Sequence, residues 1–354
     1  MRIAITGYYG TGSSAIVDLL AEYKGCSEGG LRNYEHIPLY VPDGLFDLES
    51  KLLYNNDLHR SDEAIKAFRK AMYRLSDEYQ GWFGSYQHYY GNQFKEITDR
   101  FIDNLVQYKC MGQWYHYYET PKFSLVKFAK DCLKAILPGK EPQGAFGKVN
   151  RIPPEQMMEL SFISPEDFYR HARQFIRELF HMIQGDHQFH LILDHLVFPH
   201  HAYKIDRFFD EDFRLIIVDR DVRDLYVLCK HVWPRLQVQA PYPREKEAFL
   251  ALWNRIRGAE RPCDSQKVLR VHFEDLIYRY DETVAQIEAF VGLTPEDHIA
   301  PKTRFDPARS INNTQNFRIR PEWTADVADI PQKTQDIYDF PYDRVANIED
   351  TFDI

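Results

Sequence analysis

A glycine-rich turn near the start of the chain has the residue types that bind phosphate. The segment Gly7–Ser14 reads GYYGTGSS, and it lies between a β-branched, apolar run at residues 2–6 and a helical spacing of apolar residues at 15–23. Such glycines allow backbone N–H groups to turn toward one point, and the dipole of a following helix favours negative charge at its first turn. The order of strand, turn and helix therefore predicts a phosphate-binding loop.

One position of this loop differs from the loop of kinases and GTPases. Gly7 and Gly12 have the spacing of a P-loop, but Ser13 stands where those enzymes have a lysine. That lysine acts on the β- and γ-phosphates of the nucleotide. We therefore expect phosphate binding without ordinary ATP or GTP chemistry. A glycine-rich turn with no ligand is the alternative.

Three further apolar runs predict strands at residues 189–194, 214–219 and 268–272, each followed by polar residues and then by a helical pattern. Together with the first strand they predict an open parallel sheet with crossover helices. In sheets of this kind, ligands bind outside the carboxyl ends of the strands. The residues that directly follow each strand are therefore the candidates for the site.

Two of those residues have side chains suited to chemistry. His195 follows the first of these three runs, and histidine is the usual general base near neutral pH. Its neighbour Asp194 is expected to point to the opposite side if the strand geometry continues. Arg220 follows the second run, and a guanidinium suits two-point capture of a phosphate. A structural histidine and a surface arginine paired with neighbouring aspartates are the plainer alternatives.

Three pieces of the sequence occur in the order and spacing of a known family. They are Gly10–Ser14, the run VDRDVRD at Val218–Asp224, and the stretch His272–Leu293 with its FEDL and FVGL. Together they resemble the sulfotransferases that use 3′-phosphoadenosine-5′-phosphosulfate (PAPS). The resemblance covers the first 25 residues and residues 189–315.

The resemblance implies roles for individual residues. His195 is similar to the histidine of the family's Thr-His-Leu, which is the catalytic base. Arg220 corresponds to the arginine that holds the 3′-phosphate of the nucleotide. The other nucleotide contacts that the resemblance implies, in the loop and in a later segment, are Gly10, Thr11, Gly12, Ser13, Ser14, Arg309, Ser310 and Asn313.

The chain departs from the family pattern at three positions. Gly10 stands where the family loop often carries Lys or Arg, and Leu228 stands where a serine is a second ligand of the 3′-phosphate. Val222 replaces a proline, which is a minor conformational change. Lys204 and Lys230 are candidates to supply the missing cation.

The implied reaction is transfer of a sulfuryl group from PAPS to an acceptor hydroxyl, with 3′-phosphoadenosine-5′-phosphate (PAP) as product and no metal required. The tyrosine and tryptophan content favours a carbohydrate or glycolipid acceptor, while a sterol, lipid or phenol stays open. One alternative is a kinase-like phosphotransferase with Asp194 or Asp219 as the Mg²⁺ ligand. Another is a non-catalytic member that only binds nucleotide.

The predicted fold class is α/β and P-loop NTPase-like, with a central parallel sheet flanked by helices and a large helical, aromatic-rich insertion. We assign residues 1–25 and 186–315 to the nucleotide-binding core of a single domain. Residues 26–185 form the insertion on the acceptor side, and residues 316–354 form a C-terminal segment.

Within the insertion, residues 24–60 are expected to be irregular. Tyr34-Glu35-His36 lies in a loop shortly after the first helix, a position that often faces the mouth of a phosphate site; a plain surface loop is the preferred alternative. The aromatic-rich segment 79–118 is either a wall for an acceptor or a helical layer packed on the sheet, and the layer is preferred. Helices are expected at residues 61–76, 93–108 and 122–136, and from an N-cap at Ser164 to Gln184.

The composition excludes some classes of function. The chain has 354 residues and a net charge of −9, which argues against binding to nucleic acid or to an anionic membrane. Its five cysteines include no CxxC pair, so neither a disulfide framework nor a zinc site is indicated. No transmembrane run is found, and we expect a cytoplasmic protein that acts on a small-molecule or glycan acceptor. The sequence does not indicate an oligomeric state.

Overall fold

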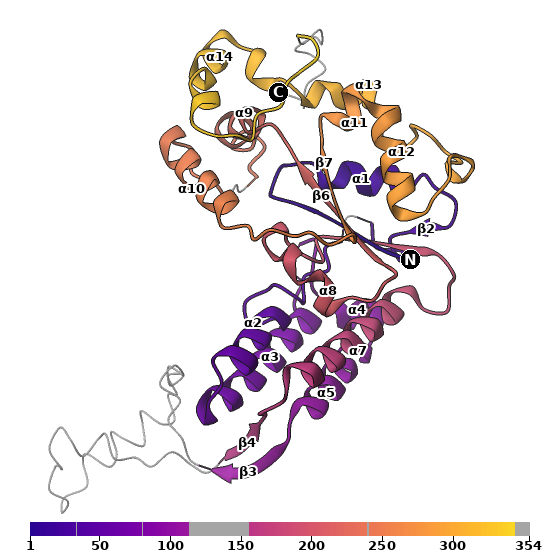
Figure 1. Cartoon of the computed structure of the whole chain (residues 1–354), viewed down its shortest axis with the longest axis vertical. Coiled ribbons are helices and arrows are strands. Elements are labelled where there is room, and N and C mark those ends of the chain that lie inside the picture. Colours follow the sequence, from indigo (N-terminus) through magenta and orange to yellow (C-terminus); the bar gives the residue numbers. More distant parts are fainter. Residues whose placement is uncertain (33, 80, 113–155, 239–240, 344–354) are drawn as a thin grey trace, which may run out of the picture.

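The computed structural model of the chain is shown in Figure 1. It describes residues 1–32, 34–79, 81–112, 156–238 and 241–343. A sheet lies at the centre, with C-terminal helices on one side of it and the long helices of residues 45–184 on the other (Figure 1).

The central sheet has five parallel strands in the order β2-β5-β1-β6-β7. The predicted α/β fold with a central parallel sheet is therefore confirmed. Ile5 lies beside Asp194 and Asp219 lies beside His272, so the carboxyl ends of four strands reach the same edge. The strands are β1 (Arg2–Gly7), β2 (Cys26–Ser27), β5 (His190–Asp194), β6 (Phe213–Asp219) and β7 (Val268–His272).

Alternate residues of the strands enter two different cores. Ala4 and Leu193 pack toward α7 (Pro165–Gln184), whereas Ile5 and Ile216 pack toward other helices on the opposite face. The period of two in a strand sends successive side chains to opposite faces, and burial on both faces explains the continuous apolar runs. The helices of the second face are α1 (Ser13–Leu20), α11 (Asp275–Tyr278) and α12 (Tyr280–Val291).

The insertion forms a helical layer, as predicted. Its core includes the stacked rings of Phe101 and Phe175, 4.8 Å apart, with Phe68 edge-on to them. The predicted end of one helix is wrong, because the chain becomes extended at Val106 and then forms an antiparallel hairpin. The elements are α2 (Leu45–Glu49), a π-helical turn (Ser50–Tyr54), α3 (Leu58–Asp77), α4 (Tyr86–Tyr90), α5 (Gln93–Leu105), β3 (Tyr108–Gly112) and β4 (Gln156–Leu160).

The helix expected after Ser164 is confirmed at both ends. The Ser164 hydroxyl accepts a hydrogen bond from the N–H of Asp167 at 3.2 Å, and Gly185 ends the helix with φ 59°. A side-chain oxygen at the N-cap satisfies one of the orphan N–H groups, and glycine adopts positive φ without strain. The capping signals alone therefore fixed the length of α7.

Other expectations within the insertion have different outcomes. Residues 45–54 are helical, so the prediction of an irregular stretch from 24 to 60 is wrong there. The expected helix at 122–136 and the aromatic residues at 114–118 lie outside the described residues. The domain boundaries stay predictions, although β2 pairs with β5 and so belongs to the sheet.

The C-terminal half packs on the carboxyl edge of the sheet. Tyr8, Trp253 and Phe317 belong to a third buried cluster that joins the loop after β1 to this half. Within the described ranges, no helix has the length and apolar character needed to cross a bilayer. The helices of this half are α8 (Ile205–Phe208), α9 (Val222–Val227), α10 (Lys246–Gly258), α13 (Pro307–Ser310) and α14 (Pro321–Val327).

Candidate functional site

The glycine-rich turn joins β1 to α1 and is stabilised by hydrogen bonds between its own residues. The N–H and the hydroxyl of Thr11 both donate to the carbonyl of Tyr8, at 3.0 and 2.8 Å. The N–H of Ala15 donates to the carbonyl of Gly12 at 3.1 Å. The N–H groups of residues 12–14 lie at the start of α1, where a helix leaves its first amides without an intrahelical acceptor. These amides and the Ser13 and Ser14 hydroxyls are suited to an anion.

At two positions of the turn, close neighbours leave no space for a side chain larger than that of glycine. Gly10 and Gly12 have φ of 85° and 94°, in the left-handed region that favours glycine. A Cβ on Gly10 would lie 2.7 Å from the ring of Trp233, and one on Gly12 would lie 2.7 Å from the ring of Phe273. The turn is therefore clamped between two aromatic rings from distant parts of the chain.

Arg220 lies directly against this turn. It is 5% exposed, its Nη1 donates to the Gly10 carbonyl at 2.9 Å, and its Nη2 donates to the Asn313 carbonyl. Its guanidinium also lies 5.0 Å from the centre of the Phe273 ring. The Nε is buried and bonds no described residue. Arg220 thus connects the turn to the later segment, while its Nε has no described partner.

The three candidates of the later segment lie at and just after α13. Asn313 is brought to the turn through its carbonyl, which Arg220 binds. Arg309 is exposed, and Ser310 is half-buried, at the end of a helical turn that Asp306 caps through the N–H of Ala308 at 2.9 Å. The structure therefore places Asn313 beside the glycine-rich turn. Arg309 and Ser310 precede Asn313 along the chain by about one turn of helix.

The two lysines considered as replacements for the loop cation are engaged elsewhere. Lys204 is buried and paired with Glu49, and Lys230 is paired with Asp326. Leu228, which replaces the family serine, is 2% exposed in the apolar core. The described contacts thus hold both lysine head groups in ion pairs away from the turn.

His195 lies immediately after β5 in an unusual backbone conformation. Its φ is 52°, its N–H donates to the Ile5 carbonyl at 2.9 Å, and its Nδ1 lies 2.9 Å from the Asp194 carboxylate. The expectation that Asp194 points away from His195 is wrong, because the positive φ breaks the alternation of the strand. A non-glycine residue in this conformation is strained and often marks a functional site.

Glu35 adds a second carboxylate to this histidine. Its Oε1 lies 4.0 Å from the His195 Nδ1, and its backbone forms a parallel bridge with Asp194. Tyr34 and His36 on either side of it are 6% and 3% exposed, so the predicted surface loop is wrong. The place of Glu35 in a loop after the first helix was the one hint that it faces the site; the contact with His195 itself had no signal, because the two residues are 160 positions apart. We call His195, Asp194 and Glu35 the histidine site.

The ionisation of the histidine site reflects its mixed surroundings. Burial by itself lowers the pKa of His195, but the hydrogen bond to Asp194 and the charges of Asp194 and Glu35 outweigh it, so the pKa is raised. The pKa of Glu35 is raised, chiefly by burial. Since Nδ1 faces both carboxylates and no described residue bonds Nε2, Nε2 is the nitrogen that can exchange a proton with a ligand.

The phosphate-type turn and the histidine site are neighbours. The ring of Tyr9, within the turn, lies 6.5 Å from the ring of His195, and Tyr9 is 43% exposed. Phe198 lies 6.0 Å from Tyr9 on the same side. A glycine-rich turn suited to an anion and a histidine paired with carboxylates therefore lie near each other at the carboxyl edge of the sheet, where such folds bind ligands.

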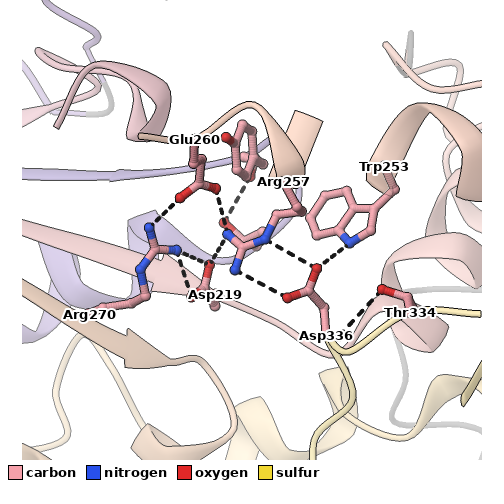
Figure 2. Close-up of polar contacts among 9 residues, drawn as sticks. Asp219, Trp253, Arg257, Glu260, Arg270, Thr334 and Asp336 are labelled. Atoms are coloured by element: carbon pink, nitrogen blue, oxygen red, sulfur yellow. Dashed lines mark hydrogen bonds and ion pairs between the residues drawn. The ribbon is translucent and has the colours of Figure 1, made fainter. Parts of the chain in front are cut away.

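A second set of charges lies at the end of β6, as Figure 2 shows. Arg257 donates to Asp219 at 3.0 Å, to Glu260 at 2.8 Å and to both oxygens of Asp336 at 3.1 Å. Arg270 donates to both oxygens of Asp219 at 2.8 Å and to Glu260 at 2.6 Å. We call these five residues the arginine network. Asp219 is therefore not paired with Arg220, as the surface-pair alternative supposed.

Two buried acids near Arg220 were not expected from the sequence. Burial raises the pKa of Glu274 to about 8 and the pKa of Asp224 to about 7, against the opposing charge of Arg220. Asp224 accepts the N–H groups of Gln315 and Asn316, at 2.7 and 2.5 Å. Asp224 thus fixes the later segment beside the turn, whereas Glu274 accepts the N–H of Asp221 at 2.9 Å. Across the described ranges, no cluster of three or more His, Cys, Asp or Glu is placed to hold a metal ion.

Comparisons with known proteins give distant likenesses. No protein-family model matches the chain, and no curated protein matches it. Sulfotransferase STF1 from Mycobacterium tuberculosis H37Rv is 14% identical over 84% of this chain and 69% of its own, with a TM-score of 0.33. The sulfotransferase domain from the curacin biosynthetic pathway is 10% identical over 93% of this chain and 97% of its own, with a TM-score of 0.36. At these values neither likeness establishes an activity or a ligand for this chain.

Proposed function

We propose that the chain is a sulfotransferase that moves a sulfuryl group from PAPS to the hydroxyl of a carbohydrate or glycolipid. One observation carries the proposal: a lysine-free phosphate-type turn and a carboxylate-bound histidine lie side by side at the carboxyl edge of a parallel sheet. Phosphoryl transfer from ATP uses the lysine that Ser13 replaces. Proton removal from an acceptor hydroxyl uses a base such as His195.

In this proposal the turn holds the 5′-phosphate end of the nucleotide. The N–H groups of residues 12–14 and the hydroxyls of Ser13 and Ser14 are the donors, supported by the dipole of α1. Thr11 is reassigned from ligand to loop shaping, because both of its donors are engaged with Tyr8. Arg220 is the residue we assign to the 3′-phosphate, as the resemblance implies.

His195 acts as the general base. PAPS supplies the sulfuryl group, and PAP leaves. The acceptor oxygen gives its proton to Nε2 and forms the new S–O bond, while the bond between sulfur and the bridging phosphate oxygen breaks. Asp194 holds the Nδ1–H and so fixes the tautomer in which Nε2 is free to accept. Amides at the start of α1 stabilise the charge that develops on the leaving phosphate.

The test is transfer of label from ³⁵S-PAPS to a panel of glycans, glycolipids, sterols and phenols. The matched loop variant is Ser14→Asp, which places a carboxylate at the first turn of α1. That charge favours the helix through its dipole but repels a phosphate, so we expect about tenfold weaker PAP binding with no loss of stability. Ser14→Asn is the neutral control. Transfer to no member of the panel, or equal PAP affinity in both variants, would contradict the proposal.

A further inference from the structure

An exposed tryptophan is held in place beside the histidine site. Trp82 is 57% exposed, yet its carbonyl accepts the N–H of Glu35 at 2.9 Å, and its side chain helps to lower the pKa of the Glu35 carboxyl against the effect of burial. The indole N–H is the only polar donor of that side chain, so it is the group that acts on the Glu35 carboxylate. An exposed Trp whose backbone is held beside a carboxylate of the histidine site is more than a scattered surface residue.

The loop that carries Trp82 is also fixed from its other end. The Tyr34 hydroxyl donates to the Gly84 carbonyl at 2.6 Å, and a bridge joins Tyr79 to Gly84. Neighbouring residues 34 and 35 therefore bind both sides of the tryptophan loop. The exposed Trp82 side chain is therefore carried by a supported loop, next to the residue whose carboxylate also faces His195.

The polar groups that accompany the indole have one chemical character. Asp194 and Glu35 are both carboxylates, which accept hydrogen bonds and donate none when ionised. They attract hydroxyl donors and repel anions. An indole face beside such acceptors matches a ring that has an apolar face and several hydroxyls at its edge, as a neutral pyranose does.

We infer that Trp82 and Glu35 form an acceptor subsite for a neutral sugar ring, which stacks on the indole and donates hydroxyls to the carboxylate. This inference rests on the proposed sulfuryl transfer at His195 and narrows its acceptor to uncharged saccharides. A uronic acid or an already sulfated sugar has the same ring but adds a negative charge next to two carboxylates. A phenol has the flat face but only one hydroxyl.

The test is ligand-observed NMR on the PAP-saturated protein with three probes: methyl β-glucopyranoside, methyl β-glucuronide and phenol. We expect the glucoside to bind best, with about tenfold discrimination against the glucuronide. Trp82→Ala should weaken glucoside binding about tenfold, whereas Trp82→Phe should keep most of it. The matched control is Tyr108→Ala, because Tyr108 is 64% exposed on the distant β3 hairpin (Figure 1). Glu35→Gln should narrow the gap between glucoside and glucuronide.

Several results would overturn the inference: equal binding of the glucuronide, tighter binding of phenol, no effect of Trp82→Ala, or no saccharide binding at millimolar concentration. PAP affinity is measured by calorimetry on the same samples. If the glucoside binds in a Trp82-dependent way but PAP does not bind, the acceptor subsite is supported and the sulfotransferase proposal is contradicted. If PAP binds but no saccharide does, the sulfotransferase proposal is supported and the acceptor subsite is contradicted.

Discussion

The histidine site and the arginine network lie at the same edge of one sheet but handle charge in opposite ways. In the arginine network each guanidinium meets two or three carboxylates, and both arginines and Asp219 are joined by short hydrogen bonds (Figure 2). In the histidine site one imidazole faces two carboxylates and keeps Nε2 free of described partners. In the first arrangement every arginine is paired with carboxylates, and in the second one ring nitrogen has no described partner.

The backbone conformation also differs between the histidine site and the arginine network. His195 has a strained positive φ, whereas Asp219 ends a regular strand in register with His272. Strain and a perturbed pKa at a strand end are typical of catalytic residues, while paired arginines across several elements are typical of a structural clamp. The comparison teaches that charge density alone does not locate the site; incomplete pairing does.

Removal of the histidine should have the largest effect. We expect His195→Ala to reduce sulfuryl transfer about a thousandfold, because the general base is lost. PAP affinity should stay unchanged, since the turn is intact. His231→Ala, on a histidine stacked on Trp323 away from the site, is the control in the same radiolabel assay. Near-normal transfer by His195→Ala would remove this residue from the mechanism.

Disruption of the arginine network should affect stability instead of turnover. Arg257→Ala leaves Asp219, Glu260 and Asp336 without their shared partner, and we expect the free energy of unfolding to fall by about 3 kcal/mol. Urea unfolding measures this change, and the kcat of the folded fraction should be retained. Arg318→Ala removes a more exposed pair with Asp343 and should cost less than about 1 kcal/mol. Equal losses from both variants would show that the network is not a clamp.

Substitution of the partner of His195 should give an intermediate effect. Asp194→Asn removes the charge that stabilises the imidazolium and weakens the control of the tautomer, so we expect kcat to fall about a hundredfold. The measurement is transfer at saturating PAPS, with circular dichroism to confirm folding. A kcat within twofold of the unchanged protein would mean that Asp194 serves only the strand end.

The smallest effect should be a shift of the pH profile. The negative charge of Glu35 helps to raise the pKa of His195, together with Asp194 and against burial; the neighbouring groups Tyr9 and Tyr40 have raised pKa values and stay neutral. Glu35→Gln therefore lowers the pKa of His195, and the base form persists to lower pH. The acidic limb of the rate profile should move to lower pH. A shift to higher pH would contradict the electrostatic assignment.

The sequence predicted the elements whose signals are local. The apolar runs located four strands of the sheet, and the caps at Ser164 and Gly185 fixed α7. The turn could be found because its glycines and serines are contiguous. The histidine could be found because strand ends of a parallel sheet meet at one edge.

The surroundings of the site could not be predicted, because they depend on contacts between distant residues. Glu35 reaches His195, and Trp82 reaches Glu35, only through the fold of the insertion. The positive φ of His195 could not be expected from the residue type, because this conformation is uncommon in any residue other than glycine. The role of Arg220 was expected from resemblance, yet its two bound carbonyls became visible only in three dimensions.

The proposed function depends on which nucleotide the protein binds, and a thermal-shift measurement tests this directly. The purified protein is heated with PAP, ATP or GTP, each with and without Mg²⁺. Stabilisation by PAP alone, unchanged by Mg²⁺ and weakened in Ser14→Asp, is expected for a lysine-free turn assisted by Arg220. Stabilisation by ATP or GTP that requires Mg²⁺, with none by PAP, would contradict the sulfotransferase assignment.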